Sequence, residues 1–449
     1  MKIKRILLSV LIIGIVLGAW VNNARVATTK LITYKNNEKL MEKYEKEGLY
    51  DRAISKCQEM LDYKDSENNW KKYVQINKEK CQSADEADDT AFSDYMDALD
   101  NAIKRVSDKS SMAIELANLY IERDDYQKAY DCLSYVKENS KASDELETLY
   151  LKTKYYVELE DDQYTEISSL SNGSYTANNG INWIYLDQTG EESEDKLGEW
   201  EYVSPIGDEG VGLRTKKNKS RLIDSDDKVM GIFDFAVSTA GKYSEEKIPV
   251  KNNDKYYYYD SLAKQILGPY EFASTFCDSK AAVEVDNKWY IIDDKGNKIK
   301  EFEDVVVNMA GDYINEGVMV AKKDGKYGLY DSDLSVIKKD IKYDAMDIYT
   351  TDGLIAFEKD GKWGYVNKDG EVIIKPQYEQ AKSFSSGLGA VCNGGRWGFV
   401  DANNNLVIEY KYLDTDYFNS EGKCFVKVEN PYSDEGYSWQ ILSLVLGVK

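Results

Sequence analysis

The side chains of this sequence that could exchange protons at neutral pH are mainly carboxylates, because no histidine occurs among its 449 residues. A chain without imidazole has no Ser-His-Asp triad, no Cys-His dyad and no HExxH zinc site. Carboxylate pairs can hydrolyse glycosides, and oxygen-rich loops can hold Ca²⁺. Acidic residues gather in three short segments, Asp224-Ser225-Asp226-Asp227, Asp293-Asp294 and Asp331-Ser332-Asp333. No motif singles out one pair, and the calcium loop D-x-D-x-(D/N)-G is absent, so we expect turns in which Asp or Asn bonds its own backbone.

The cysteines offer no second set of catalytic or metal-binding residues. They form no CxxC pair, which argues against a zinc ribbon or a thioredoxin-type site; they are Cys57, Cys81, Cys132, Cys277, Cys392 and Cys424. Neither the phosphate loop GxxxxGK(S/T) nor a GxGxxG that opens a helix occurs. The sequence therefore predicts no catalytic residue, no metal ligand and no cofactor, and hence no enzyme.

The charge balance narrows the class of partner. The chain has 58 Lys and Arg against 80 Asp and Glu, a net charge of −22. Phosphate binding needs clustered basic residues, so this balance argues against nucleic acid and against docking on anionic lipid by charge. With 42% hydrophobic residues the chain is globular.

The N-terminus has the pattern of a membrane anchor. Basic residues precede an uncharged run from Ile6 to Val21, which spans about 24 Å as a helix against a hydrocarbon core of about 30 Å. Extension to Ala24 closes that difference. We expect residues 1–30 to be an uncleaved signal-anchor with the basic side in the cytoplasm and the bulk of the chain outside. The alternative is a cleaved signal peptide and a secreted protein.

Residues 31–171 follow a helical period. One helix face is predicted by the spacing of Phe92, Tyr95, Met96, Leu99, Ile103 and Val106. Residues 110–141 resemble a tetratricopeptide repeat, through Leu116, Ala117, Tyr120, Ala129, Leu133 and Val136. A weaker copy covers residues 34–65, and a third helix pair is expected over residues 144–170 with its turn at Asp161-Asp162. The region is interpreted either as a groove for a peptide or as a spacer between the membrane and the C-terminal domain.

An aromatic residue returns at steps of 33 to 38 through the rest of the chain, with one exception at Ser220. Its positions are Trp183, Tyr256, Trp289, Tyr327, Trp363 and Trp397, and glycine follows the last three as Gly328, Gly364 and Gly398. A second aromatic column follows 13 to 16 residues later at Tyr270, Phe302, Tyr343, Tyr378 and Tyr412. A fixed period of this length predicts stacked copies of one small β unit.

These repeat positions are predicted to have structural roles. An aromatic ring at a fixed strand position can stack on the next unit, and a glycine after it lets a neighbouring backbone approach closely. An apolar-apolar-Asp/Asn triplet follows most of the rings, as in Tyr365-Val366-Asn367 and Phe399-Val400-Asp401, and should start a turn.

The repeat residues resemble a known family. The segment Gly361-Lys362-Trp363-Gly364-Tyr365-Val366-Asn367 is similar to a WG (or KWG) repeat of bacterial surface and secreted proteins, and residues 395–401 and 325–329 are further copies. The resemblance is strong over residues 317–430. It implies a β-repeat array with a binding role and implies no defined activity.

Seven full units run from Gly173 to Glu421, and a part unit follows from Cys424 onward. Seven small sheets can close into a propeller, in which the part unit would pair with the first blade; an open array of hairpins is the alternative. We therefore predict an α+β multidomain chain with a signal-anchor at 1–30, helices at 31–171 and an all-β repeat domain at 172–449.

The predicted function is binding. We expect a membrane-anchored, extracytoplasmic and non-catalytic scaffold that binds a protein partner and contacts the membrane through its N-terminal helix. A cell-wall glycan binder that uses tyrosine and tryptophan of the repeats is one alternative. A carboxylate-based hydrolase is the other.

Overall fold

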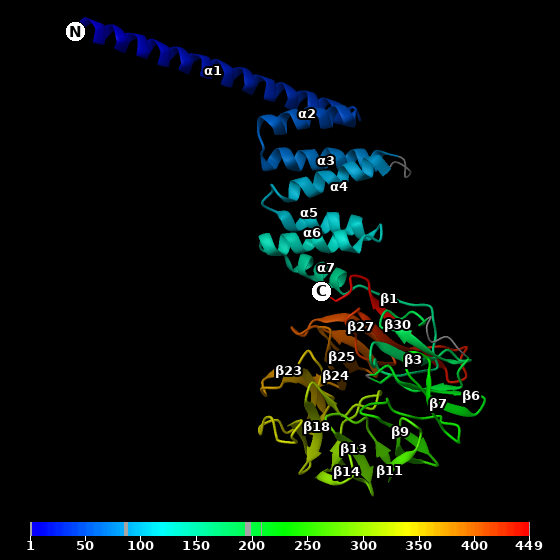
Figure 1. Cartoon of the computed structure of the whole chain (residues 1–449). Coiled ribbons are helices and arrows are strands. Elements are labelled where there is room, and N and C mark those ends of the chain that lie inside the picture. Colours follow the sequence, from blue (N-terminus) through cyan, green and yellow to red (C-terminus); the bar gives the residue numbers. More distant parts are fainter. Residues whose placement is uncertain (1, 85–88, 194–198, 208, 449) are drawn as a thin grey trace. The chain divides into compact units, whose positions relative to one another are not determined.

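The structure, a computed structural model, describes residues 2–84, 89–193, 199–207 and 209–448, with side chains from Trp20 onward. The chain divides into two compact units, Met1–Lys154 and Tyr155–Lys449 (Figure 1). Helices build the first unit and strands build the second. This supports the predicted combination of an α-helical region with a C-terminal β domain.

The described part of the first unit contains seven helices. They are α1 (Lys2–Lys46), α2 (Tyr50–Tyr63), α3 (Glu67–Ser83), α4 (Asp89–Ile103), α5 (Lys109–Ile121), α6 (Tyr126–Asn139) and α7 (Asp144–Lys154). One buried apolar cluster runs from α3 to α7, and a second joins α1, α2 and α3. Successive helices thus pack their apolar faces together, as the helical period predicts.

The helix pair α5–α6 follows the predicted pattern. Ala117, Ala129 and Leu133 are fully buried in the shared cluster, and the Asp125 carboxylate caps α6 by accepting from the backbone N–H of Lys128 at 3.1 Å. Small side chains such as alanine let two helices approach closely. The resemblance of this pair to a tetratricopeptide repeat stays a prediction.

The third helix pair predicted over residues 144–170 does not form. Only α7 is helical, and the chain then enters strand β1 (Val157–Leu159), which pairs with β30 (Tyr437–Leu444). Asp161 and Asp162 therefore lie in a loop of the β unit. The units divide after Lys154, earlier than the boundary at 171 and 172 expected from the sequence. Residues 157–164 pair with β30, far along the chain, and residues 166–171 pair with the strand of the β unit that follows them.

No helix among the residues with described side chains is long and apolar enough to span a membrane. The run from Ile6 to Val21, which supports the signal-anchor prediction, lies outside those residues except for Trp20 and Val21.

Eight small antiparallel sheets make up the described part of the second unit, and we number them as blades in chain order (Figure 1). Blade 1 contains β2 (Glu166–Ile167), β3 (Ser174–Asn178) and β4 (Trp183–Asp187); blade 2, β5 (Tyr202–Val203), β6 (Gly212–Lys216), β7 (Lys219–Ile223) and β8 (Val229–Ile232); blade 3, β9 (Lys247–Asn252), β10 (Lys255–Asp260) and β11 (Gln265–Tyr270); blade 4, β12 (Phe272–Ala273), β13 (Lys280–Val285), β14 (Lys288–Asp293) and β15 (Lys298–Phe302).

The other blades follow the same order from inner to outer strand. Blade 5 contains β16 (Asp304–Val305), β17 (Ile314–Asn315), β18 (Val318–Lys323) and β19 (Lys326–Asp331); blade 6, β20 (Ala345–Met346), β21 (Leu354–Lys359), β22 (Lys362–Asn367) and β23 (Val372–Tyr378); blade 7, β24 (Gln380–Ser385), β25 (Leu388–Asn393), β26 (Arg396–Val400) and β27 (Leu406–Tyr412); blade 8, β28 (Asp414–Thr415), β29 (Lys423–Glu429), β30 and, outermost, β1.

The eight blades close into a propeller. Every neighbouring pair of blades shares a buried apolar cluster, including blades 8 and 1, where Phe425 and Ile441 pack with Tyr175 and Leu186. Residues from the two ends of the domain thus bury each other, and an open array would leave both of these faces in water. The structure therefore supports the propeller over the open array.

The predicted count of blades was one too few. The part unit after Cys424 forms most of an eighth blade, and its outer strand β1 comes from the start of the domain, with Val157 opposite Leu444 and Leu159 opposite Leu442. The strand β30 would otherwise leave a row of backbone groups unpaired. Closure by β1 satisfies these groups and joins the two ends of the ring.

Candidate functional site

The two aromatic columns of the sequence lie opposite each other across neighbouring strands. The observed pairs are Tyr256 with Tyr270, Trp289 with Phe302, Tyr327 with Tyr343, Trp363 with Tyr378 and Trp397 with Tyr412. Trp183 pairs with Trp200, and Trp439 of blade 8 pairs with Tyr164. The repeat aromatics thus meet one partner each within a blade and do not gather at a common site.

The glycines after these aromatics sit where an outer strand passes closely. A Cβ added to Gly364 would lie 2.4 Å from the carbonyl oxygen of Ile374, and one added to Gly398 would lie 2.5 Å from that of Ile408. At Gly328 the corresponding distance to the Ile341 oxygen is 3.2 Å. A side chain at the first two positions would displace the neighbouring backbone.

A deeper column lies two residues after the first aromatic. The hydroxyl groups of Tyr185, Tyr258 and Tyr365 donate to carbonyl oxygens of the next blade at 3.1, 2.7 and 2.7 Å. Of the first column, Trp183 and Tyr256 also reach a ring of the next blade, at 5.6 and 5.3 Å between ring centroids. Contact between units was predicted for the first aromatic column, and this deeper, fully buried tyrosine column was not predicted.

The acidic segments form the predicted turns. In Asp293 and Asp401 one carboxylate oxygen accepts from the backbone N–H groups two and four residues later, at 2.8 to 3.0 Å. The same pattern occurs at Asp224, Asp260 and Asn367. Among the described residues, no group of three or more Cys, Asp or Glu is placed to hold a metal ion.

The inner strands bring charged residues together that the sequence analysis did not single out. Four residues after the second aromatic, the inner strand carries Ser168, Ser204, Ser274, Val306, Asp347, Lys382 and Asp416 in blades 1, 2, 4, 5, 6, 7 and 8. Their backbones have equivalent pairing, as in Ser274 with Ala282 and Asp416 with Phe425. The three charged members thus come from three successive blades, 6 to 8.

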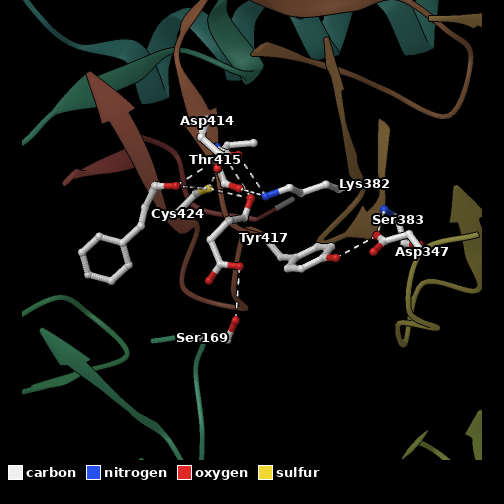
Figure 2. Close-up of polar contacts among 10 residues, drawn as sticks. Ser169, Asp347, Lys382, Ser383, Asp414, Thr415, Tyr417 and Cys424 are labelled. Carbon is white, nitrogen blue, oxygen red and sulfur yellow. Dashed lines mark hydrogen bonds and ion pairs between the residues drawn. The ribbon is translucent and has the colours of Figure 1, made fainter. Parts of the chain in front are cut away.

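Asp416 is the most enclosed member of this group. Its side chain is only 3% exposed, and one oxygen accepts from the Ser169 hydroxyl of blade 1 at 3.3 Å (Figure 2). Burial raises the pKa of Asp416 to about 6, and the positive charge of Lys382 opposes that rise. The Asp416 carboxylate therefore becomes protonated as the pH falls just below neutral.

Lys382 and Asp347 link the blades through other contacts. The Lys382 ammonium lies 3.1 Å from an Asp414 oxygen and also donates to the Thr415 carbonyl (Figure 2). Asp347 accepts from the Tyr417 hydroxyl at 2.7 Å and from the Ser383 backbone N–H at 2.6 Å. Tyr417 of blade 8 therefore reaches blade 6 past the inner strand of blade 7.

A polar cavity of about 280 Å³ opens beside these residues. Blades 1, 5, 6, 7 and 8 contribute to its wall, which includes Ser169, Asp312, Asn315, Thr350, Asp416 and Asn419. The wall comes from the inner strands and the turns that follow them, so the cavity occupies the centre of the ring. It is the candidate ligand site of the propeller.

Two hollows on the helical unit form a second candidate surface. Trp70 and Tyr73 line one hollow of about 320 Å³, and Tyr120 and Tyr135 line another of about 270 Å³. The end of α4 and the turn after it contribute to both, with Arg105 in the first. Because residues three or four apart share a helix face, the two hollows lie on adjacent sides of α4.

Cations cover the aromatic walls of both hollows. The Arg105 guanidinium lies 4.9 Å from the Trp70 ring centroid, and the Lys128 ammonium lies 5.7 Å from that of Tyr120. Acidic residues stand at the rims, namely Asp62, Asp65, Asp100 and Asp131. Such surfaces provide apolar contact and charge-assisted hydrogen bonds to an extended ligand.

The cysteine thiols are not activated as nucleophiles. Burial raises the pKa of Cys57 and of Cys132 to about 12 and also raises that of Cys424. A thiol in this state lacks the thiolate that nucleophilic catalysis requires. The thiols of Cys57, Cys132, Cys277, Cys392 and Cys424 form no disulfide.

Comparison with known proteins identifies WG containing repeats at residues 337–363, 363–397 and 397–432. No curated protein sequence matches the chain. Among solved structures, Kluyveromyces lactis Hsv2p is 9% identical over 62% of this chain and 96% of its own, with a TM-score of 0.36. The Neurospora crassa Pan2 WD40 domain is 11% identical over 54% and 89%, with a TM-score of 0.31. PorZ of Porphyromonas gingivalis is 8% identical over 61% and 43%, with a TM-score of 0.32. At these values the likenesses say nothing about ligand or activity.

The repeat itself carried the signal for the missed residues. Asp347, Lys382 and Asp416 each follow a second-column tyrosine by four residues. When the repeats are aligned on that tyrosine, the position four residues later holds serine or valine in the early copies. In the last three copies it holds a charged residue. That change marks the inner strands of blades 6 to 8 as different from the rest.

Proposed function

We propose that the chain is a non-catalytic binding protein, anchored in a membrane by its N-terminal segment, whose helical unit binds a protein partner outside the cytoplasm. The observation that carries the proposal is the pair of aromatic-walled hollows that flank the end of α4. They offer apolar contact, cations and carboxylates along one surface, which suits an extended peptide segment.

The contacts within these hollows explain how a partner would be held. Arg105 forms an ion pair with Asp65 at 3.3 Å, and Lys104 pairs with Asp100 at 2.7 Å. Both pairs are largely exposed, so they contribute little stability to the fold and can exchange for charged groups of a partner. The rings of Tyr73 and Tyr135 supply rigid contact area at low entropic cost.

Several described thiols and carboxylates are engaged within the fold, which fits a binding role. The described thiols with a shifted pKa are held protonated, and the repeat acids at Asp293 and Asp401 are occupied by turn hydrogen bonds. The hydrogen bonds of Asp347 join inner strands of different blades. These groups hold the structure together.

Site-specific photo-crosslinking in the native cell tests the partner surface. A photoreactive phenylalanine at Tyr73 or Tyr135 should capture a protein that mass spectrometry identifies. The same residue at Gln75, which is exposed on α3 and does not line either hollow, is the matched control. Equal capture from Gln75, or retention of the chain on purified wall polysaccharide without any protein partner, would contradict the proposal.

The membrane location requires a separate test. The basic start and the uncharged run from Ile6 to Val21 support an anchor with the bulk of the chain outside. An alkaline-phosphatase reporter fused after residue 30 should be active, and the chain should sediment with membranes. An inactive reporter would refute export, and a soluble extracellular chain would show that the segment is cleaved.

A further inference from the structure

We propose that the central cavity of the propeller binds the ammonium or guanidinium group of a small organic cation. This inference does not rest on the proposed function, because it concerns the propeller and not the hollows of the helical unit. Neither the sequence pattern nor the family resemblance pointed to this cavity. The hydrogen-bonding groups of the cavity wall that are not already occupied determine which ligand it suits.

Several donor groups of the wall are occupied by neighbouring blades. The Asn419 side-chain N–H₂ donates to the Tyr175 hydroxyl at 3.0 Å and to the Gln188 carbonyl at 2.7 Å. Asn315 donates to the Tyr349 carbonyl at 3.1 Å, and the Thr350 hydroxyl donates to the Phe384 carbonyl. These bonds tie the inner turns of adjacent blades together, so the Asn419 N–H₂ and the Thr350 hydroxyl are not available as donors to a ligand.

The acceptor groups of the wall remain in excess. Asp416 receives one long side-chain hydrogen bond, from Ser169 at 3.3 Å, and a backbone hydrogen bond from Tyr417. Asp312 is paired with Lys242 at 3.0 Å and receives a weak bond from Asn308 at 3.4 Å. A carboxylate has about four lone-pair positions, so both groups keep capacity for further donors.

The charges around the cavity also favour a cation. Lys382 lies within ion-pair distance of Asp414 and Lys242 within that of Asp312. Asp416, which lines the cavity, has no ion-pair partner among the described residues. A buried carboxylate without an ion-pair partner is costly, and an incoming cation would offset that cost.

A second polar group faces this region without a partner. The Thr275 hydroxyl makes no hydrogen bond in the described structure, although the residue is only 2% exposed. It lines an adjoining cavity of about 130 Å³ that shares Asp312 and Asn315 with the central one. Buried hydroxyl groups almost always have a partner, so this one is free to bond a ligand or a water held with it.

The size and wall of the cavity define the ligand further. A volume of about 280 Å³ lies just below the usual range for drug-sized ligands, so it suits a single head group with a short chain. The Tyr417 and Tyr349 rings line it, and aromatic rings attract organic cations. The shared chemistry is an ammonium or guanidinium group, supplied by a free amine or by a lysine or arginine side chain.

Calorimetric titration of the full chain in mild detergent tests the inference. Butylguanidinium and butylammonium are the cationic probes, butylurea is the neutral control of similar shape, and a short peptide with one internal arginine represents a side chain. We expect binding of at least one cationic probe and none of butylurea. Binding of the free cation alone would identify a small amine as the source, and tighter binding of the peptide would identify a side chain.

Three variants decide where the probe binds. Asp416→Asn should weaken cation binding by about tenfold, the size expected for loss of one charge-assisted hydrogen bond. Thr351→Trp should abolish it by filling the mouth, since Thr351 lines the cavity with an exposed side chain that tolerates bulk. Asp369→Asn, in an exposed turn of blade 6, should change nothing. Equal affinity for butylurea, or unchanged binding in both Asp416→Asn and Thr351→Trp, would overturn the inference.

Discussion

The inner strands on two sides of the propeller share their backbone pairing and differ in what their side chains do. In blades 1, 2 and 4 the serine hydroxyls of Ser168, Ser204 and Ser274 accept from a backbone N–H of the next strand at 2.8 to 3.0 Å and donate to their own neighbouring carbonyl at 3.1 Å. In blades 6 to 8 the equivalent Asp347, Lys382 and Asp416 contact other blades instead.

This difference shows how one repeat position can serve two purposes. A serine whose hydroxyl bonds only within its own blade needs no hydrogen bond from a neighbouring blade. A charged residue at the same position reaches past its blade and is stabilised by contacts with other blades. The side of the ring that contains blades 6 to 8 therefore depends more on contacts between blades, and it also contributes most of the polar wall of the cavity.

The largest expected effect is a loss of stability, and it tests whether buried tyrosines stabilise both sides of the propeller equally. Tyr258→Ala in blade 3 and Tyr365→Ala in blade 6 should each lower the free energy of unfolding by about 3–5 kcal/mol. Both rings are fully buried and pack edge-on against a phenylalanine of the next blade, at 4.8 and 4.7 Å between centroids. Urea unfolding followed by tryptophan fluorescence measures the loss. Tyr432→Ala, at an exposed tyrosine, is the control. Unequal losses of unfolding free energy in the blade 3 and blade 6 variants would show that the two sides are not stabilised in the same way.

The next effect concerns the buried carboxylate of the charged side. The pKa of Asp416 is about 6 in the fold against a usual 3.8, so below about pH 4 both states are protonated. As pH rises from 4 to 6 only the unfolded state ionises, and the fold loses stability, by about 3 kcal/mol in all. Asp416→Asn removes this loss, so its stability relative to the wild type should rise by that amount between pH 4 and pH 7.

Chemical denaturation at several pH values measures that change. Asp369→Asn, in an exposed turn, should keep the pH dependence of the wild type. A parallel pH dependence of Asp416→Asn and the wild type would show that Asp416 is not enclosed as described.

A smaller loss is expected on the serine side. Ser274→Ala should lower the free energy of unfolding by about 1–3 kcal/mol, because the Ala282 N–H would lose its buried acceptor. The change should not alter cation binding in the cavity, since Ser274 does not line it. Unfolding and calorimetry of the same variant measure both. An altered affinity would mean that the two sides are coupled.

The proposed cation site should also respond to pH. Because the pKa of Asp416 is about 6, the carboxylate is mostly ionised at pH 7 and mostly protonated at pH 5. Binding of butylguanidinium should therefore weaken by about tenfold between these values. The dependence should disappear in Asp416→Asn, and its persistence there would assign it to another group.

The smallest effect tests the link across blade 7. Tyr417→Phe removes the 2.7 Å hydrogen bond to Asp347 and should cost about 1 kcal/mol. The Asp347 carboxylate keeps the Ser383 N–H, so the loss stays modest. Hydrogen exchange should show faster opening of the inner strands of both blade 6 and blade 8. Faster exchange in blade 8 alone would argue against the link.

Much of the repeat domain was predictable from local pattern. The spacing of Trp363 and Tyr378 marked both as repeat positions of one unit, and in the structure they are directly paired. Asn367 and Asp401 form the turns expected of their side chains. These features depend on residues close together in the chain, whose geometry is set by strand alternation and turn chemistry.

The candidate site was not predictable in the same way. Nothing in the sequence around Asp416 shows that its neighbours are Ser169 and Lys382, because those residues come from blades 1 and 7. The charged column is visible once the repeats are aligned on Tyr343, Tyr378 and Tyr412. Its meaning depends on the ring, which places the ends of these strands around one cavity.

The sequence by itself determined the period, the two aromatic columns, the turns and the presence of a helical region before a β-repeat region. The tertiary structure decided that the ring has eight blades, that β1 closes it and that the Asp416 carboxylate of blade 8 lies beside Ser169 of blade 1. The physical reason is the range of the interactions. Strand and turn geometry act over a few residues, whereas closure depends on burial between segments such as Val157 and Leu444, which are far apart in sequence.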